Sequence, residues 1–139
     1  MRDERPRFVL DTFALLAYLQ QEPGYQQVKD ILIRAKRGEA EVFLSIVSYG
    51  EALYILERQQ GIAQVPHVIG VIDQLPLQVL NADRSLAFAA AHVKANHSIS
   101  YADAFVVALG QQTGAVVVTG DPEFHAVEHL ITMEWLPQP

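Results

Sequence analysis

The stretch "FVLDTFALL" at positions 8–16 places one acidic residue, Asp11, inside an otherwise apolar run. The run begins in a strand pattern, "RFVLD" (7–11), and continues into a helix pattern, "TFALLAYLQQ" (12–21), which ends near Pro23. A strand followed at once by a helix is the repeating unit of a parallel sheet covered by helices. Asp11 is therefore expected at the end of the first strand.

The same alternation continues along the chain. Further strand patterns occupy 41–45, 76–81 and 115–121, and the tail "ITMEWLP" (131–137) is expected to form a short edge strand. Helical periodicity occupies 25–37, 46–61, 65–75, 83–97 and 100–114. We therefore expect an α/β protein with a three-layer α/β/α fold, a central parallel sheet of four or five strands, and a single domain over residues 1–139.

Composition limits the possible functions. The chain has 139 residues, half of them hydrophobic, which is enough for one buried core. Because it contains no cysteine, disulfides, thiolate zinc sites, iron–sulfur clusters and cysteine nucleophiles are excluded, and a reducing compartment such as the cytoplasm is expected. The net charge of -6 argues against binding nucleic acid through a diffuse basic surface. The longest uncharged run, 104–120, is interrupted by "GQQTG", so no membrane span is expected.

Two basic stretches are open to interpretation. The N-terminal segment lacks the pattern of a signal peptide, and the role of Arg2, Arg5 and Arg7 ahead of the first strand is undetermined. The stretch "IRAKR" (33–37) is either a local basic cluster that could contact nucleic acid or a solvated helix end, where the macrodipole favours positive charge.

Four segments of the chain, 8–19, 42–56, 99–109 and 114–121, each contain a single charged residue, and in every case it is acidic. These residues are Asp11, Glu51, Asp103 and Asp121. Two of them are expected to end strands, and the other two lie in the early turns of helices. In an open parallel sheet, these positions meet at one edge, where such folds place their sites. The four carboxylates can therefore converge.

Each acid alone also has a structural explanation. The sequences "SYGE" (48–51) and "SYAD" (100–103) match the capping box, in which an acid reaches back to a backbone amide. Asp121 precedes a proline and Asp11 precedes a helix pattern, so both are possible N-caps.

Considered together, the four acids predict a metal site. Carboxylates gathered in a partly buried site repel each other and raise one another's pKa unless a cation intervenes. Ligands that are all oxygen suit magnesium or manganese better than zinc. Such ions can activate a water and stabilise the charge that builds on a phosphodiester. Metal-dependent phosphodiester hydrolysis is therefore the leading chemistry.

The four stretches that carry these acids resemble, in order, the four acidic motifs of the PIN-domain nucleases. They are "FVLDTFALLAYL", "LSIVSYGEALY", "SYADAFVVAL" and "VVVTGDPEF", and they extend over nearly the whole chain. The fourth is similar to the family's Thr-x-Asp followed by an aromatic residue, here Thr119, Asp121 and Phe124.

The resemblance implies roles for particular residues and partners. The catalytic, metal-binding acids would be Asp11, Glu51, Asp103 and Asp121, supported by hydroxyl hydrogen bonds from Thr12 and Thr119. Thr12 could equally be an ordinary capping hydroxyl. A compact chain with one such domain is similar to the VapC ribonuclease toxins of toxin-antitoxin pairs. That similarity implies Mg²⁺, with Mn²⁺ able to substitute, an RNA substrate, a cognate antitoxin and a homodimer.

Other readings compete with this one. "HAVEH" (125–129) fits the zinc pattern H-x-x-E-H, although two histidines still need a third ligand, and a role for His125 and His129 stays open. A phosphoaspartyl phosphatase would need an acid at Phe13, and no G-x-G-x-x-G motif supports dinucleotide binding. A PIN-like protein-binding module with a weak site, and an RNA-processing PIN nuclease without an antitoxin, are the remaining alternatives.

Overall fold

The computed structural model describes residues 4–137, so Arg2 lies outside the described residues. Within this range the chain forms one sheet of five strands. They are β1 (Arg7–Leu10), β2 (Glu41–Ser45), β3 (Gln78–Leu80), β4 (Val116–Thr119) and β5 (Met133–Trp135). The expected edge strand in the C-terminal tail is confirmed as β5.

The helices follow the expected order. The α-helices are α1 (Thr12–Leu19), α2 (Tyr25–Lys36), α3 (Ile46–Gln60), α4 (Val65–Asp73), α5 (Arg84–Asn96) and α6 (Tyr101–Thr113). Two short 3-10 helices that the periodicity did not predict are η1 (Ile62–Gln64) and η2 (Pro122–Val127). None of the helices in residues 4–137 combines the length and apolar character needed to cross a membrane.

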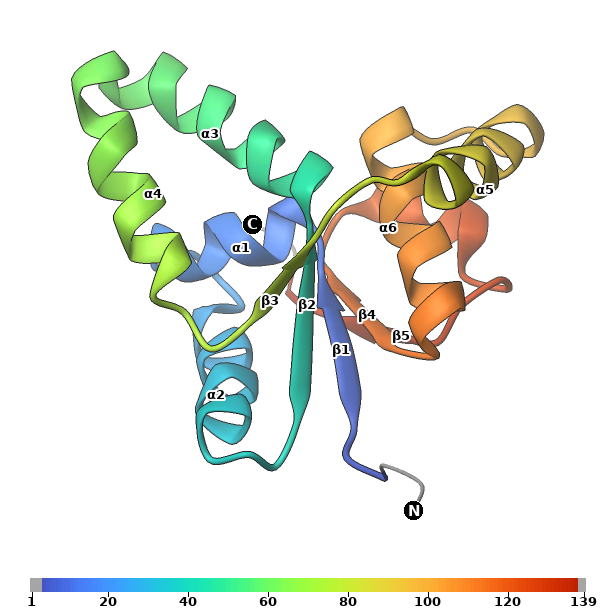
Figure 1. The fold of residues 1–139 in the computed structure, drawn as a ribbon, viewed down its shortest axis with the longest axis horizontal. Coiled ribbons are helices and arrows are strands. Elements are labelled where there is room, and N and C mark those ends of the chain that lie inside the picture. The colour runs from blue at the N-terminus through green and yellow to red at the C-terminus, as the bar shows by residue number, and fades with distance from the viewer. Residues whose placement is uncertain (1–3, 138–139) are drawn as a thin grey trace.

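The strands are all parallel and lie in the order β3-β2-β1-β4-β5. The chain adds β2 and β3 on one side of β1 and then crosses back to place β4 and β5 on the other side (Figure 1). The direction of winding therefore reverses between β1 and β4. In open α/β sheets, ligands bind outside the carboxyl ends of the strands at such a switch point.

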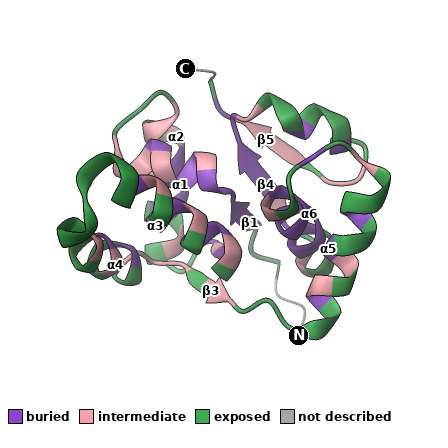
Figure 2. Ribbon diagram, turned by 90° about the horizontal axis from the view of Figure 1, so that it is seen from above, coloured by how far each residue is buried: buried purple, intermediate pink, exposed green. Residues whose placement is uncertain are grey.

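The central strands β1, β2 and β4 are buried on both faces of the sheet, which explains their runs of apolar residues. Side chains alternate between the faces: Leu10 of β1 and Val118 of β4 pack on the side of α1 to α4, whereas Val9 and Val117 pack on the side of α5 and α6. Figure 2 shows the buried β1 and β4 between these two layers. The expected α/β class with a parallel sheet in a three-layer arrangement is confirmed.

Helix α6 is buried along most of its length, from Asp103 to Gly110. It can approach the sheet closely because Gly110 has no side chain: a Cβ there would lie 2.9 Å from Val117 Cγ2. The helix ends at Gly114, whose φ of 65° is the left-handed conformation that glycine adopts without strain. Burying a charged side chain on such a helix costs free energy unless the side chain is paired or hydrogen-bonded. The burial of the Asp103 carboxyl at the start of this stretch therefore requires a group that stabilises its charge.

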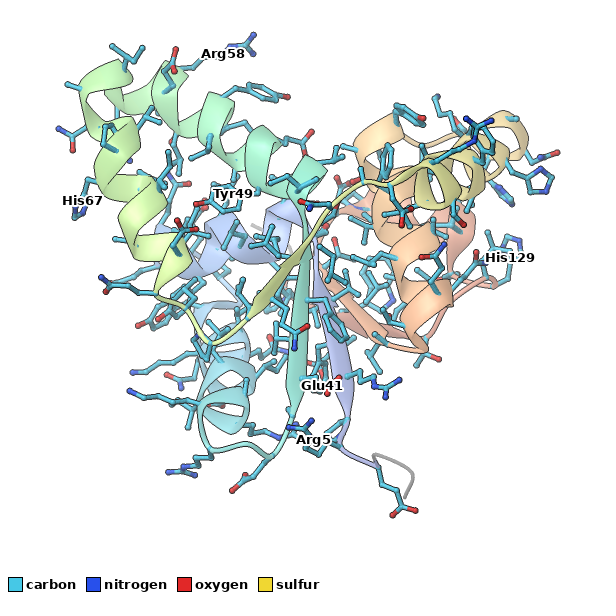
Figure 3. All side chains as sticks on the ribbon, in the orientation of Figure 1. Arg5, Glu41, Tyr49, Arg58, His67 and His129 are labelled. Carbon is cyan, nitrogen blue, oxygen red and sulfur yellow. The ribbon has the colours of Figure 1, made fainter. Side chains whose placement is uncertain are left out.

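The basic residues near the N-terminus have structural partners. Arg5 and Arg7 both form ion pairs with Glu41, at 2.7 Å and 3.3 Å, and Arg7 also donates to the Thr113 carbonyl. Figure 3 shows Arg5 and Glu41 at the end of the sheet where β1 begins. The "IRAKR" residues Arg34 and Lys36 lie in the last turn of α2. Since α2 leads into the start of β2, these cations lie at the edge opposite the strand ends, as a solvated helix end predicts.

Gly120, directly after β4, is required by the packing of α1. A Cβ at this position would overlap the ring of Phe13, lying 2.6 Å from Cζ. We expect Gly120→Ala to lower the free energy of unfolding by about 1–3 kcal/mol, because either the new methyl group or the Phe13 ring must shift. Gly70→Ala in α4 is the control: its Cβ would meet nothing within 4 Å. Alanine there should stabilise the helix by about 0.5–1 kcal/mol. Urea unfolding measures both, and a neutral Gly120→Ala would contradict the packing.

Candidate metal centre

Asp11 occupies the position directly after β1 and is the N-cap of α1. Its Oδ1 accepts the Ala14 N–H at 2.8 Å, and its side chain is 1% exposed. Burial raises the pKa of this carboxyl from 3.8 to about 8. Hydrogen bonds from Thr119 and Ala14 act in the opposite direction, and the charges of Asp103 and Asp121 raise the pKa further. Capping therefore explains the position of Asp11 without explaining how its charge is tolerated.

The hydroxyl of Thr119, the last residue of β4, connects two of the predicted acids. Thr119 Oγ1 donates to Asp11 Oδ2 and accepts the backbone N–H of Asp121 at 3.0 Å. This buried hydroxyl holds the ends of β1 and β4 together at the switch point. Thr12 is buried at the start of α1, but no hydrogen bond from its hydroxyl to an acid occurs in residues 4–137. Its supporting role stays a prediction.

Asp103 lies in the first turn of α6, one of the two core-facing helices on its side of the sheet. Ser100 is the N-cap and accepts the Asp103 N–H at 3.2 Å, as the "SYAD" pattern predicts. Burial raises the pKa of the Asp103 carboxyl to about 7. A hydrogen bond with Ser100 lowers this pKa, while the charges of Asp121, Glu123 and Glu51 raise it. Several carboxylates therefore act on one buried acid.

Asp121 and Glu123 complete a compact acidic group. Asp121 is the N-cap of η2 and accepts the Glu123 N–H at 2.9 Å, with Pro122 at the first helical position as expected. The carboxylate oxygens of Asp103, Asp121 and Glu123 lie within 4.8 Å of one another. The sequence analysis missed Glu123. The signal that could have found it is its place two residues after Asp121, in the first turn of the helix that Asp121 caps.

Glu51 is located at the margin of this group. It lies on α3 and is close enough to Asp103 for its charge to raise the pKa of that carboxyl, but it is outside the set of three. The proposed "SYGE" capping box is wrong. Helix α3 begins at Ile46, as the helical pattern over 46–61 predicts, and Ser45 caps it by accepting the Val47 N–H at 3.1 Å. Ser48 is therefore inside the helix, buried, and its Oγ has no hydrogen-bond partner in the described chain.

Within residues 4–137, no ion pair compensates the charge of the acids at the strand ends. In the part of the chain that the structure describes, the ion pairs of the acidic residues involve Glu41 and Glu128 and none of the five acids at the strand ends. The clustered carboxylates of Asp103, Asp121 and Glu123 form a set of hard oxygen donors whose mutual repulsion a divalent cation would neutralise. The donor set contains neither nitrogen nor sulfur, which favours magnesium or manganese over zinc.

The competing zinc pattern does not assemble. His125 Nδ1 contacts Glu128 Oε2 at 3.1 Å, but the His129 ring lies beside that of His97, with centroids 5.4 Å apart. Within residues 4–137, the only grouping of three or more possible ligands is the acidic one. A cavity of about 470 Å³ near His129, at the far end of α6, contains none of the predicted acids. The acidic group instead lies at the open carboxyl edge of the sheet.

Removing the Thr119 hydroxyl should loosen this edge. Thr119→Val keeps the shape of the side chain but leaves the Asp121 N–H without its acceptor and removes a donor to Asp11. We expect a loss of about 1–3 kcal/mol in the free energy of unfolding, the usual cost of an unsatisfied buried polar group. Thr119→Ser, which retains the hydroxyl, is the matched control. Equal stability of the two variants in urea unfolding would show that the hydroxyl is unimportant.

Comparison with known proteins agrees with this geometry. The model of the PIN domain family matches residues 8–130. The chain therefore belongs to the PIN domain family. No curated protein sequence matches the chain.

Several solved structures share the fold at low sequence identity. A chain of VapBC2 from Rickettsia felis, bound to a DNA fragment from their promoter, is 14% identical, with a TM-score of 0.72 over 94% of this chain and 98% of that one. DNA-bound VapBC from Salmonella typhimurium gives 20% identity and a TM-score of 0.73, over 93% and 97% of the two chains. VapC20 of Mycobacterium tuberculosis, a Sarcin-Ricin loop cleaving toxin, is 19% identical in sequence. Its TM-score is 0.68, over 86% of this chain and 94% of that one.

Proposed function

We propose that this PIN domain is a divalent-metal-dependent endoribonuclease that hydrolyses RNA phosphodiester bonds. The observation that carries the proposal is the close group of Asp103, Asp121 and Glu123, backed by the buried Asp11. A group of acids at the switch point of a parallel sheet lies where ligands of such folds bind. Hydrolysis of a phosphodiester is the chemistry that oxygen-ligated Mg²⁺ or Mn²⁺ best serves.

The proposed ligands of the ion are Asp103, Asp121 and Glu123, with Asp11 and Glu51 completing its surroundings. When bound, Mg²⁺ or Mn²⁺ would supply positive charge that activates a water and offsets the charge developing on the phosphodiester. These assignments place the four acids predicted from the sequence in the site and add Glu123 to them.

The acidic residues have different proposed roles because their environments differ. Both oxygens of Asp11 already accept hydrogen bonds, from Ala14 and Thr119, so its orientation is fixed before any ligand arrives. Burial raises the pKa of Asp103 to about 7 in the metal-free chain, so binding of a divalent ion by this carboxyl would displace a proton near neutral pH. Glu123 is exposed and Asp121 partly exposed, so these two acids face the side from which a substrate would approach.

The relatives support the proposed substrate and the proposed antitoxin partner. One chain of similar fold cleaves the Sarcin-Ricin loop, and others occur in VapBC complexes. We propose that this protein is likewise the RNA-cleaving toxin of a toxin-antitoxin pair, with a cognate antitoxin, a homodimeric assembly and a cytoplasmic location. A single domain over residues 1–139 is part of the proposal.

The test is cleavage of a mixed RNA pool by the purified protein. With Mg²⁺ or Mn²⁺ we expect cleavage that EDTA abolishes and that Asp11→Asn lacks. Products should carry a 5′-phosphate. If the wild-type protein stays inert under all metal conditions while it still binds a protein partner, the alternative of a PIN-like binding module holds instead.

A further inference from the structure

Trp135, the last residue of β5, lies beside the acidic centre. It pairs in register with Thr119, and paired residues of parallel strands point to the same side of a sheet. Met133 and Trp135 both pack on the side of the sheet that α5 and α6 cover. The indole is therefore the neighbour of the hydroxyl that donates to Asp11.

His125 stacks on this indole. The two ring centroids are 4.3 Å apart, and the planes are inclined by 22°. The imidazole is also held by Glu128, 3.1 Å from Nδ1, while 60% of the His125 side chain stays exposed. Two contacts thus fix the orientation of a ring whose outer surface is open to solvent.

The stacked pair borders the proposed metal ligands. Helix η2 begins at the cap Asp121 and carries both Glu123 and His125. Two residues of a 3-10 helix advance about 4 Å along its axis. The axial separation of Glu123 and His125 is therefore shorter than the length of one nucleotide, from its phosphate to its base.

The charge of the protein limits how it can hold RNA. Net charge is -6, and the acids gather at the site itself, so phosphate neutralisation by a basic surface is weak. Stacking of bases on aromatic rings needs no positive surface and is the other general source of affinity for single strands. Resting on the proposed nuclease function, we propose that His125, backed by Trp135, is a stacking platform for the base next to the scissile phosphate of single-stranded RNA.

The chain has its own reporter for this contact, because Trp135 is its single tryptophan. Binding is measured in the presence of Mn²⁺ with an oligouridine analogue that cannot be cleaved, so that the metal-binding acids stay intact. We expect saturable change in tryptophan emission with oligouridine, and little change with an oligonucleotide of equal length that lacks bases. His125→Ala should weaken oligouridine binding about 5- to 150-fold, the range that loss of one stacked base corresponds to.

Two further variants separate stacking from other roles. His125→Phe keeps a flat ring and should restore most of the affinity, whereas His129→Ala should change nothing, since this exposed histidine lies away from the sheet edge (Figure 3). In the active chain, His125→Ala should raise the KM for RNA much more than it lowers kcat, with an unchanged melting temperature.

The outcomes are distinguishable. Suppose that the wild type cleaves RNA but tryptophan emission changes equally with and without bases, or that His125→Ala binds oligouridine as tightly as the parent does. Either result refutes the stacking platform and leaves the nuclease proposal intact. Failure of His125→Phe to restore binding also refutes stacking. A protein that neither binds nor cleaves RNA overturns the nuclease and the platform together.

Discussion

Replacing Asp103 by asparagine is expected to reduce RNA cleavage by about 100-fold or more, because charge stabilisation by a divalent ion contributes several kcal/mol to such reactions. The same change should remove most of the thermal stabilisation by Mn²⁺. A ligand at a free concentration of about 100 times its Kd stabilises the folded protein by about 2.7 kcal/mol. A melting series with and without Mn²⁺, run beside a cleavage assay, measures both effects.

The control for this variant is Asp30→Asn, which removes an equal charge from an exposed position on α2. It should cleave RNA and respond to Mn²⁺ as the wild type does. If Asp103→Asn kept wild-type activity, Asp103 would have no part in the chemistry. If both variants lost the Mn²⁺ response equally, the ion would bind diffusely and not at the acidic group.

Replacing Asp11 by asparagine is expected to stabilise the metal-free protein at neutral and higher pH. The pKa of Asp11 is 3.8 ordinarily and about 8 in the folded chain, so between these values only the folded state holds the proton. Stability conferred by this group therefore falls as pH rises, by up to about 1.4 kcal/mol per pH unit. Asparagine can still accept the capping hydrogen bond from the Ala14 N–H, but its side chain does not ionise. Urea unfolding in EDTA from about pH 5 to about pH 8 measures the slope.

Asp83→Asn is the matched control for the Asp11 variant. Asp83 caps α5 by accepting the Leu86 N–H at 2.8 Å, the same contact that Asp11 makes to Ala14, but it is exposed and is not part of the acidic group. Asp83→Asn should leave the pH slope of stability unchanged. An Asp11→Asn protein that unfolds more easily than the wild type at about pH 8 would contradict a buried, repulsive carboxyl.

The sequence predicted the features that depend on local pattern. Valine-rich runs and strand-then-helix alternation predicted β1, β2 and β4, and a short apolar tail predicted β5 at the edge. The caps at Asp11, Asp121 and Ser100 followed from residue type and position. Isolated acids at strand ends and helix starts indicated one edge of the sheet, because parallel topology brings those positions together.

Features that depend on packing could not be predicted in the same way. The start of α3 at Ile46 followed from the helical pattern, but its cap did not, because Ser45 and Ser48 both suit a cap and only the end of β2 decides between them. Glu123 was missed because its distance to Asp103 depends on how η2 folds over β4. The stacking of His125 on Trp135 likewise joins elements that have no shared sequence pattern.

The central claim is that the strand-end acids form one site that a divalent ion neutralises. Calorimetric titration of Mn²⁺ into the protein, near pH 6.5 and in buffers of different ionisation enthalpy, tests it most directly. We expect saturable binding with proton release, because the pKa values of Asp11 and Asp103 are raised to about 8 and about 7. We expect neither in an Asp103→Asn, Asp121→Asn double variant. Binding that this double variant retains, or the absence of binding by the wild type, would contradict the claim.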